Sequence, residues 1–217
     1  MSTGTVGPGL RRLAWANLLY NLFVILWGAY VRATGSGAGC GEHWPVCNGE
    51  VIPRDPSIET IIEYTHRVTS GLALVGVIAL FVWARRALPP GHLVRTGALA
   101  SLVLMIVEAL LGAGLVLFGL VADDASTARA FAMALHLVNT LLLLGAMALT
   151  AWWASGGGAL RLRGQGIAGA LLAGALVTML VLGASGALSA LGNSLFPEVR
   201  GLGAHLAPGA HLLLKLA

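Results

Sequence analysis

Charged residues are scarce in this sequence of 217 residues. Asp, Glu, Lys and Arg together make up 10% of the chain, whereas soluble domains carry about 25%. Hydrophobic residues make up 57%, and the mean hydropathy is +0.84. So few charges exclude an ordinary soluble domain, and we predict a polytopic membrane protein.

Basic residues are also few, and they are scattered. The 13 lysines and arginines raise the pI to about 9.7, but they lie between apolar runs and form no patch with interleaved aromatic residues. Because a nucleic-acid-binding surface needs such a patch, no nucleic-acid partner is expected.

Polar residues are nearly missing from five long runs of the sequence, and this predicts the fold class. Each run is close to or above the roughly 20 residues that an α-helix needs to cross a bilayer. The 30 glycines suit helices that pack by close backbone approach. We predict an all-α, polytopic membrane helical bundle rather than a barrel, with spans at Leu13–Val31, Thr60–Trp83, Val94–Val121, Arg129–Trp153 and Ile167–Leu191.

Arginines between the runs predict the orientation of the chain. They precede the first run and occupy the second and fourth connections, while acidic residues dominate the other connections. Because positively charged loops stay in the cytoplasm, the N-terminus is predicted to be cytoplasmic. The arginines concerned are Arg11, Arg12, Arg85, Arg86, Arg95, Arg161 and Arg163.

The fifth run resembles the first. Residues 183–192 and 28–37 are both small-residue helix ends with a polar glycine turn, and an aromatic-proline pair follows each, Phe196-Pro197 and Trp44-Pro45. The offset of about 155 residues suggests a repeated four-helix unit. A second copy of the stretch around Glu63 would begin where the sequence stops, so we expect a fragment truncated from an eight-helix, two-repeat architecture.

The repeat predicts the division of the chain. We expect a cytoplasmic N-terminal lead at 1–12, a four-helix half-domain at 13–154 with an outer loop at 33–58, a cytoplasmic linker at 155–166, and at 167–217 a fifth transmembrane helix that starts an incomplete second half.

Both cysteines lie in the outer loop. Cys40 and Cys47 are predicted to be outside the cell, where disulfides persist. We predict a disulfide worth about 2–3 kcal/mol on the chain-entropy model; unpaired thiols and a redox-active pair are the alternatives. A metal site is disfavoured, because His43 is the only further soft ligand nearby.

Ionisable residues interrupt the second run and define the candidate site. Glu63, His66 and Arg67 lie in the otherwise apolar segment 58–81. Charges in a bilayer are costly and usually face a bundle interior, a cavity or a bound group. Glu63 and His66 are three residues apart and share one helical face, so we predict a functional role for this stretch.

A second histidine is predicted to be level with His66. At about 1.5 Å per residue, His66 lies on the order of 9 Å and His136 roughly 10 Å below the outer ends of their helices. Two histidines at one depth suit axial ligation of one haem, because an imidazole must approach each face of the macrocycle. Asn139 shares the face of His136 and is a candidate for orienting a ligand.

Each of these residues also has a purely structural interpretation. Membrane histidines often form hydrogen bonds between helices, and Glu63 can pair with Arg67 four residues on. Arg67 and Arg32 are candidates for binding haem propionates, but Arg32 at a helix end can equally snorkel. Glu108, in the middle of the third run, has no evident partner, and we expect it to be protonated or hydrogen-bonded between helices.

Four motifs give the chain a close resemblance to the bacterial and mitochondrial heme A synthase family. The resemblance covers the N-terminal four-helix half and the first helix of the C-terminal half. The motifs are Gly28-Ala29-Tyr30-Val31-Arg32-Ala33-Thr34-Gly35-Ser36-Gly37, the loop from Cys40 to Trp44-Pro45-Val46-Cys47-Asn48-Gly49, Glu63-Tyr64-Thr65-His66-Arg67, and His136-Leu137-Val138-Asn139-Thr140.

The resemblance implies an oxidoreductase that converts a methyl group of haem O to a formyl group, which makes haem A for cytochrome oxidase assembly. His66 and His136 would be axial ligands of the haem iron, Glu63 the acid important to catalysis, and Cys40 with Cys47 the outer disulfide. Haem O would be the substrate, and a haem b cofactor would belong to the missing C-terminal half. The implied location is the inner (plasma) membrane, with the cysteine loop on its outer face.

The implied partners are haem O with the upstream synthase that farnesylates it, an unidentified electron acceptor or donor, and a second copy of the chain in a homo-oligomer. Two other functions compete. A non-catalytic haem b-binding membrane cytochrome or electron-transfer anchor would use His66 and His136 as ligands, without need of Glu63 or the cysteine loop. A transporter with charges along a permeation path would bind no haem.

Overall fold

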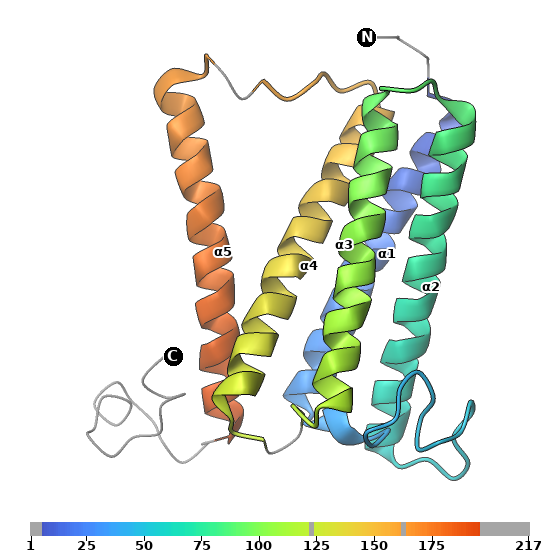
Figure 1. Cartoon of the computed structure of the whole chain (residues 1–217), viewed down its shortest axis with the longest axis vertical. Coiled ribbons are helices and arrows are strands. Elements are labelled where there is room, and N and C mark those ends of the chain that lie inside the picture. The colour runs from blue at the N-terminus through green and yellow to red at the C-terminus, as the bar shows by residue number, and fades with distance from the viewer. Residues whose placement is uncertain (1–5, 122–123, 162–163, 196–217) are drawn as a thin grey trace.

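The computed structural model describes residues 6–121, 124–161 and 164–195, and these ranges are helical apart from their connecting loops (Figure 1). All five α-helices are long and apolar enough to cross a membrane. The predicted all-α class is therefore confirmed for the described residues. The elements are α1 (Pro8–Ala33), the short 3-10 helix η1 (Ser36–Ala38), α2 (Ile58–Ala87), α3 (Leu93–Leu117), α4 (Thr127–Ala154) and α5 (Gly166–Leu195).

Serine caps set the starts of two helices. The Ser57 hydroxyl accepts a hydrogen bond from the backbone N–H of Thr60 at 3.2 Å, and this caps α2. Ser126 caps α4 in the same way, through the N–H of Arg129 at 3.1 Å. Both helices consequently begin two residues before the predicted spans, at Ile58 and Thr127 instead of Thr60 and Arg129.

Other boundaries also differ from the predicted spans. α1 begins at Pro8, so residues 8–12 of the expected lead are helical. α3 ends at Leu117 instead of Val121, because Gly119 adopts a left-handed conformation with φ of 63°, which terminates a helix. Residues 1–5 of the lead, Arg163, and residues 196–217 of the expected second half lie outside the described residues.

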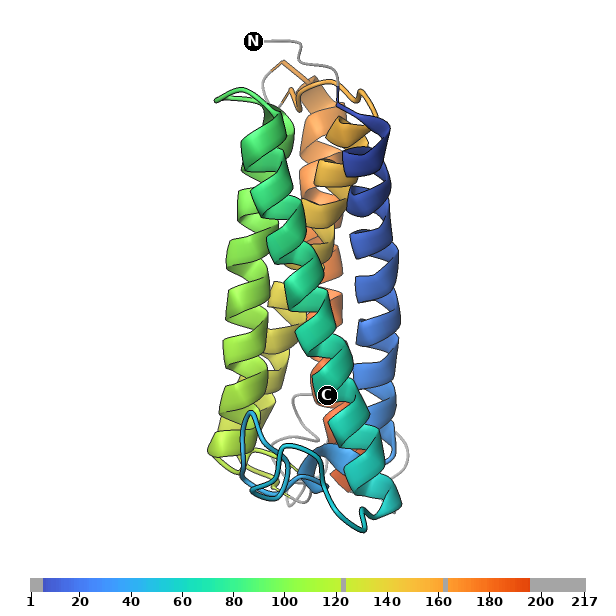
Figure 2. The same ribbon diagram turned by 90° about the vertical axis from the view of Figure 1, so that its right-hand side faces the viewer.

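Helices α1 to α4 form an antiparallel bundle, and α5 packs against α4 at its side (Figures 1 and 2). Around the bundle each helix is packed against the next, and α4 closes the ring by packing against α1. The helices α2 and α4 therefore occupy opposite corners. Side chains that point inward from these two helices face each other across the bundle.

A buried apolar core fills the bundle, and apolar side chains also cover its outside. Val77, Leu143 and Met147 are among the fully buried core residues, whereas Leu26 on α1 is 71% exposed. Close approach between helices uses glycine: a Cβ at Gly76 of α2 would lie 2.5 Å from Oδ1 of the buried Asn17 on α1. An apolar exterior and glycine-mediated contacts are typical of helices packed in lipid.

The two ends of the bundle differ in chemistry. The disulfide loop between α1 and α2 lies at the end opposite the start of α1 (Figure 1). The end that holds the start of α1 also holds the last turn of α2 and the first turn of α3. It carries the arginines Arg11, Arg12, Arg85, Arg86 and Arg95.

Candidate functional site

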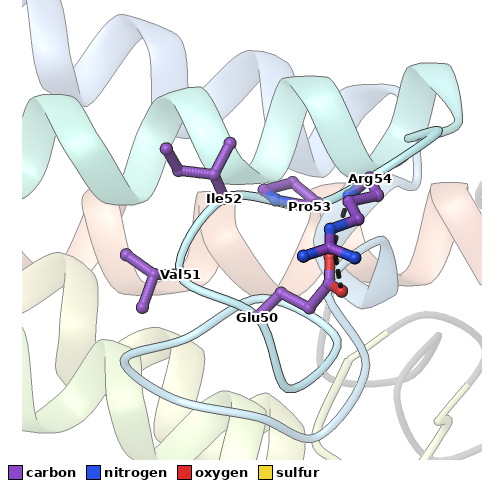
Figure 3. A pocket seen from close by; sticks show the side chains of 5 residues that line it. All are labelled: Glu50, Val51, Ile52, Pro53 and Arg54. Carbon is purple, nitrogen blue, oxygen red and sulfur yellow. Dashed lines mark hydrogen bonds and ion pairs between the residues drawn. The ribbon is translucent and has the colours of Figure 1, made fainter.

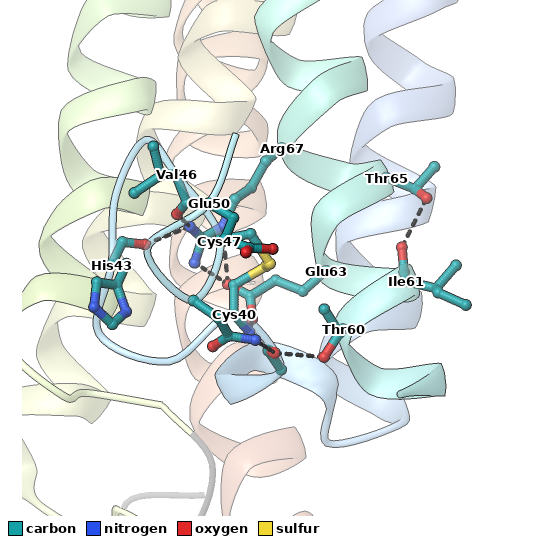
Figure 4. The surroundings of a disulfide bond; sticks show 12 residues. Cys40, His43, Val46, Cys47, Glu50, Thr60, Ile61, Glu63, Thr65 and Arg67 are labelled. Atoms are coloured by element: carbon teal, nitrogen blue, oxygen red, sulfur yellow. Dashed lines mark hydrogen bonds and ion pairs between the residues drawn. A yellow bond between two sulfur atoms is a disulfide. The ribbon is translucent and has the colours of Figure 1, made fainter. Parts of the chain in front are cut away.

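The two cysteines form a disulfide, as predicted. Cys40 and Cys47 are joined by an S–S bond of 2.01 Å, and both residues are fully buried. The loop that they close folds back over the first turns of α2 (Figure 4). The Thr60 hydroxyl donates to the Gly39 carbonyl at 2.7 Å, and a Cβ at Gly39 would collide with the backbone of Glu59 and Thr60. Glycine at position 39 is therefore required for this close approach.

Glu63 connects α2 to this loop. Glu63 is buried, with 4% of its surface exposed. One carboxylate oxygen, Oε2, accepts a hydrogen bond from the backbone N–H of Cys40 at 2.8 Å, and the other, Oε1, accepts one from Nε of Arg67 at 3.0 Å and a second from Nη2. The pairing of Glu63 with Arg67, one of the two interpretations of this motif, is therefore present in the structure (Figure 4).

Arg67 completes the connection. Its Nη1 donates to the backbone carbonyls of His43 and of Val46, the latter at 2.7 Å. All three guanidinium nitrogens are thus engaged by Glu63 and by the loop. The ion pair is nearly enclosed, with side chains of Arg67 and Glu63 that are 11% and 5% exposed. Together these contacts hold the disulfide loop against α2.

His66 and His136 occupy corresponding positions on opposite helices. His66 comes eight residues after the start of α2, and His136 nine residues after the start of α4. Because both helices begin two residues earlier than predicted, each histidine is about 3 Å deeper than predicted, and the two are still level at about 1.5 Å per residue.

Each imidazole lies near a glycine of a neighbouring helix. A Cβ at Gly28 of α1 would come within 2.9 Å of Cε1 and 3.1 Å of Nε2 of His66, a separation that a real Cβ does not tolerate. A Cβ at Gly112 of α3 would lie 3.9 Å from Cε1 of His136, an ordinary contact. The His66 ring therefore needs the space that glycine at position 28 leaves open.

Both histidines have an unsatisfied buried nitrogen. Nδ1 of His66 and Nδ1 of His136 are buried without a hydrogen-bond partner in the part of the chain that the structure describes. Buried polar atoms are nearly always satisfied, so two unsatisfied imidazoles at one level need a ligand or a proton acceptor. Two imidazoles on opposite helices fit the axial positions of a haem, and these residues therefore fit that group.

Haem is the metal group that this arrangement suits. Among the described residues no group of three or more His, Cys, Asp or Glu side chains is placed to hold a metal ion. Axial ligation of a haem needs only two protein ligands, because the macrocycle supplies the other donor atoms.

Glu108 has partners that the sequence analysis did not identify. Asn139 on α4 donates from Nδ2 to Oε2 of Glu108 at 2.6 Å, and the Thr140 hydroxyl donates to Oε1. Oε1 also lies 3.5 Å from Nδ1 of His136. The expectation of an interhelical hydrogen bond at Glu108 is borne out, and Asn139 contacts this carboxylate. Because His136, Asn139 and Thr140 are spaced i, i+3 and i+4, they share one face, which was the available signal for a buried acid opposite them.

Two further features lie at the end of the bundle that holds the disulfide loop. Arg32 is half-buried in the last turn of α1, and its side chain makes no hydrogen bond or ion pair within the described ranges. Figure 3 shows a surface concavity of the loop between α1 and α2, lined by Glu50, Val51, Ile52, Pro53 and Arg54. The Arg54 and Glu50 side chains form an exposed ion pair of 3.7 Å across it, a kind of pair that contributes little.

The fold and the paired histidines define a membrane helical bundle suited to haem, and comparison with known proteins places the chain more closely. The sequence profile of the COX15-CtaA family, described as a cytochrome oxidase assembly protein, matches residues 11–198. The chain belongs to this family, which is the heme A synthase family. The resemblance noted from the motifs is therefore confirmed.

This chain matches only part of each of the longer relatives. A heme A synthase of Alkalihalophilus pseudofirmus is 51% identical over 98 residues, 45% of this chain and 33% of that protein. A heme A synthase of Bacillus licheniformis is 40% identical over 146 residues, 66% of this chain and 45% of that protein. A protoheme IX farnesyltransferase of Thermus thermophilus is 59% identical over 215 residues, 96% of this chain and 35% of that protein. The chain spans about a third of the length of the first and third of these relatives.

Proposed function

We propose that this chain binds haem O between His66 and His136 and takes part in the oxidation of its methyl group to a formyl group, as a heme A synthase. The observation that carries this proposal is the pair of level imidazoles on α2 and α4, neither of which makes a hydrogen bond to a described residue through its buried Nδ1. Membership of the heme A synthase family supports an oxidoreductase of haem chemistry.

In this proposal the imidazoles of His66 and His136 bind and orient the macrocycle. Haem O supplies the methyl carbon that is oxidised. The glycine at position 28 leaves room for the His66 ring beside α1, and the disulfide loop covers the outer end of α2 above it. Because haem O carries an apolar tail, a site between helices that opens to the bilayer can receive it from the lipid.

Glu63 is proposed as the acid that acts at the edge of the bound macrocycle. It is buried one helical turn from His66, where a carboxylate can move protons or stabilise developing positive charge. Its hydrogen bonds to Cys40 and Arg67 hold it in place. Glu63→Gln in a complete protein tests this role: haem A formation should fall while haem loading stays normal, and undiminished formation with normal loading refutes it.

Arg67 and Arg32 are proposed as partners of the haem propionates. Arg67 suits this role because it directly follows His66 on α2, and Arg32 because it lies in the last turn of α1, at the same end of the bundle. Since Arg67 already donates to two loop carbonyls, propionate binding there would require one of those bonds to be exchanged.

The orientation and the partners belong to the proposal as well. The arginine-rich end of the bundle is placed in the cytoplasm by the positive-inside rule, which puts the N-terminus inside and the disulfide loop on the outer face of the inner (plasma) membrane. A haem b cofactor is proposed for the part of the relatives that lies beyond this match. The partners of the proposal are an electron acceptor or donor and a second copy of the chain; an acceptor is needed because the methyl carbon loses electrons when it becomes a formyl group.

A farnesylating synthase is the proposed source of the substrate. The Thermus thermophilus relative, which is similar to nearly all of this chain, bears the name protoheme IX farnesyltransferase, and about two thirds of it lies outside the match. This supports a close association between the enzyme that makes haem O and the protein that uses it.

The second candidate function is a non-catalytic haem b-binding membrane cytochrome or electron-transfer anchor. The engagement of Glu63 by Cys40 and Arg67 favours it, because an acid that only fastens the loop leaves the histidines as simple ligands. Both functions require haem to be retained by the chain.

Spectroscopy and pigment extraction separate these functions. The purified chain should give the reduced-minus-oxidised spectrum of a low-spin haem, whereas a chain without haem absorbance contradicts both candidates. Expression in a host that makes haem O, followed by extraction of the pigments, should yield haem A from a complete enzyme and unchanged haem from a cytochrome. The His92→Ala variant is the control, because His92 caps α3 at the opposite end of the bundle.

A further inference from the structure

We propose that Glu108 is a positioning residue for His136. Its carboxylate accepts a hydrogen bond from the Nδ1–H of the imidazole, and this tautomer leaves Nε2 as the nitrogen that would face the haem iron. This inference rests on the proposed function, because it concerns His136 as an axial ligand.

The geometry of the carboxylate carries the inference. Oε1 of Glu108 lies 3.5 Å from Nδ1 of His136, slightly beyond the upper limit of about 3.2 Å for an N–H···O hydrogen bond. That Nδ1 is buried and has no hydrogen-bond partner in the described ranges. Hydrogen bonds of functional groups are often long before the ligand is bound, and a small rotation of the ring closes this one.

Two further side chains of α4 hold the carboxylate of Glu108 in place. Asn139 donates from Nδ2 both to Oε2 of Glu108 at 2.6 Å and to the backbone carbonyl of Leu104 at 3.0 Å. Thr140 donates to Oε1. Because a carboxylate has about four acceptor positions, these two donors leave Oε1 with capacity for the His136 proton. Glu108 lies on α3 and all three partners lie on α4, so the interhelical contact itself sets the ring orientation.

Among the described residues no carboxylate stands to His66 as Glu108 stands to His136. The nearby acid, Glu63, is engaged by the N–H of Cys40 and by Arg67, and Nδ1 of His66 has no hydrogen-bond partner among the described residues. The two axial ligands are therefore inequivalent. A carboxylate behind a ligating histidine orients the ring and raises its basicity, so His136 donates more strongly and favours the oxidised iron.

The experiment titrates the purified full chain in detergent with haemin. Three chains are compared: the wild type, Glu108→Gln and the control Ser101→Ala. The control changes a different buried polar group of α3, a hydroxyl without a hydrogen-bond partner within the described part of the chain. Glu108→Gln should weaken haemin binding by about tenfold to a hundredfold, move the midpoint potential to a more positive value, and change the electron paramagnetic resonance g values of the low-spin iron. Ser101→Ala should leave all three unchanged.

A purely structural clamp between α3 and α4 gives a different result. In that case Glu108→Gln lowers the thermal stability but leaves the potential and the g values unchanged, and the inference is overturned. If Glu108→Gln does not fold, Thr140→Val carries the test, because it keeps the carboxylate and removes one donor to it. A smaller shift of the potential, to a more negative value, is expected for Thr140→Val, because Oε1 then accepts more strongly from His136; no shift overturns the inference.

Failure of the proposed function has its own signature. A wild-type chain that binds no haemin, or a His136→Ala variant that binds it with an unchanged spectrum, removes His136 as a ligand and the inference with it. An unchanged Glu108→Gln variant beside a defective His136→Ala variant overturns the role of Glu108 alone.

Discussion

Glu63 and Glu108 are both acids within the bundle near a candidate haem ligand, but their carboxylates face different partners. Glu63 shares a helix with His66 and turns to the cysteine loop, where it meets a cation and a backbone N–H. Glu108 comes from the helix next to His136 and meets the neutral Asn139, Thr140 and the imidazole itself. Proximity in the sequence is therefore a poor guide to which acid contacts an imidazole: Glu63 is three residues from His66, but it is Glu108 that lies beside an imidazole, that of His136.

The comparison separates two uses of a buried carboxylate. A carboxylate paired with arginine fastens one segment to another and must stay paired, because an unpaired buried charge is strongly destabilising. A carboxylate held by neutral donors keeps an acceptor position for a further proton. The following predictions test this difference, from the largest expected effect to the smallest.

Loss of either histidine should have the largest effect. His66→Ala or His136→Ala removes one axial ligand, and we expect each variant to lose the retained haem completely. The reduced-minus-oxidised spectrum of the purified chain measures this loss. An unchanged spectrum for His66→Ala would exclude that residue from the site and leave Glu63 with its loop contacts only.

Truncation of the two acids should differ in its effect on stability. Glu63→Ala leaves the guanidinium of Arg67 buried without its carboxylate, so the free energy of unfolding should fall by about 3–5 kcal/mol. Glu108→Ala leaves only neutral donors unsatisfied, which should cost about 1–3 kcal/mol. Denaturant unfolding in detergent measures both values. Equal losses would contradict the distinction between the two carboxylates.

Removal of the disulfide should have an intermediate effect confined to the Glu63 side. Cys47→Ser opens the loop that Glu63 and Arg67 hold, and the free energy of unfolding should fall by about 2–3 kcal/mol. Reductant should produce the same loss in the wild type and none in the variant. A change in the g values of the bound haem iron would show that the loop and the haem site are coupled.

Substitution of the two glycines beside the imidazoles should have the smallest effect, and the two variants are matched because each adds one methyl group next to a histidine. Gly28→Ala places a Cβ 2.9 Å from Cε1 of His66, and such overpacking should cost about 1–3 kcal/mol and weaken haemin binding. Gly112→Ala makes only an ordinary 3.9 Å contact with His136, so little change is expected in either measurement. Thermal unfolding and haemin titration of both variants check this, and equal effects would contradict the close packing of His66.

Much of the fold could be predicted from the sequence. The apolar runs predict the five helices, because each is long enough to satisfy its backbone polar groups within lipid. Their ends are less predictable, since the caps at Ser57 and Ser126 and the left-handed Gly119 set them through local hydrogen bonds and backbone geometry. The cysteine pair and its disulfide could be predicted because the two cysteines are only seven residues apart and the arginine pattern predicts an outer location for their loop.

By itself the sequence determined which residues are ionisable within the membrane, and at which depth. Depth follows from the regular rise of a helix, so His66 and His136 could be placed at one level from their distances to the helix starts. The tertiary structure alone decided which way each side chain faces. These helices are apolar around most of their circumference, so hydrophobic periodicity does not identify the inward face. The packing of α3 against α4 and of the loop against α2 therefore assigned Glu108 to His136 and Glu63 to Cys40, whereas the pairing of Glu63 with Arg67 already follows from their i, i+4 spacing.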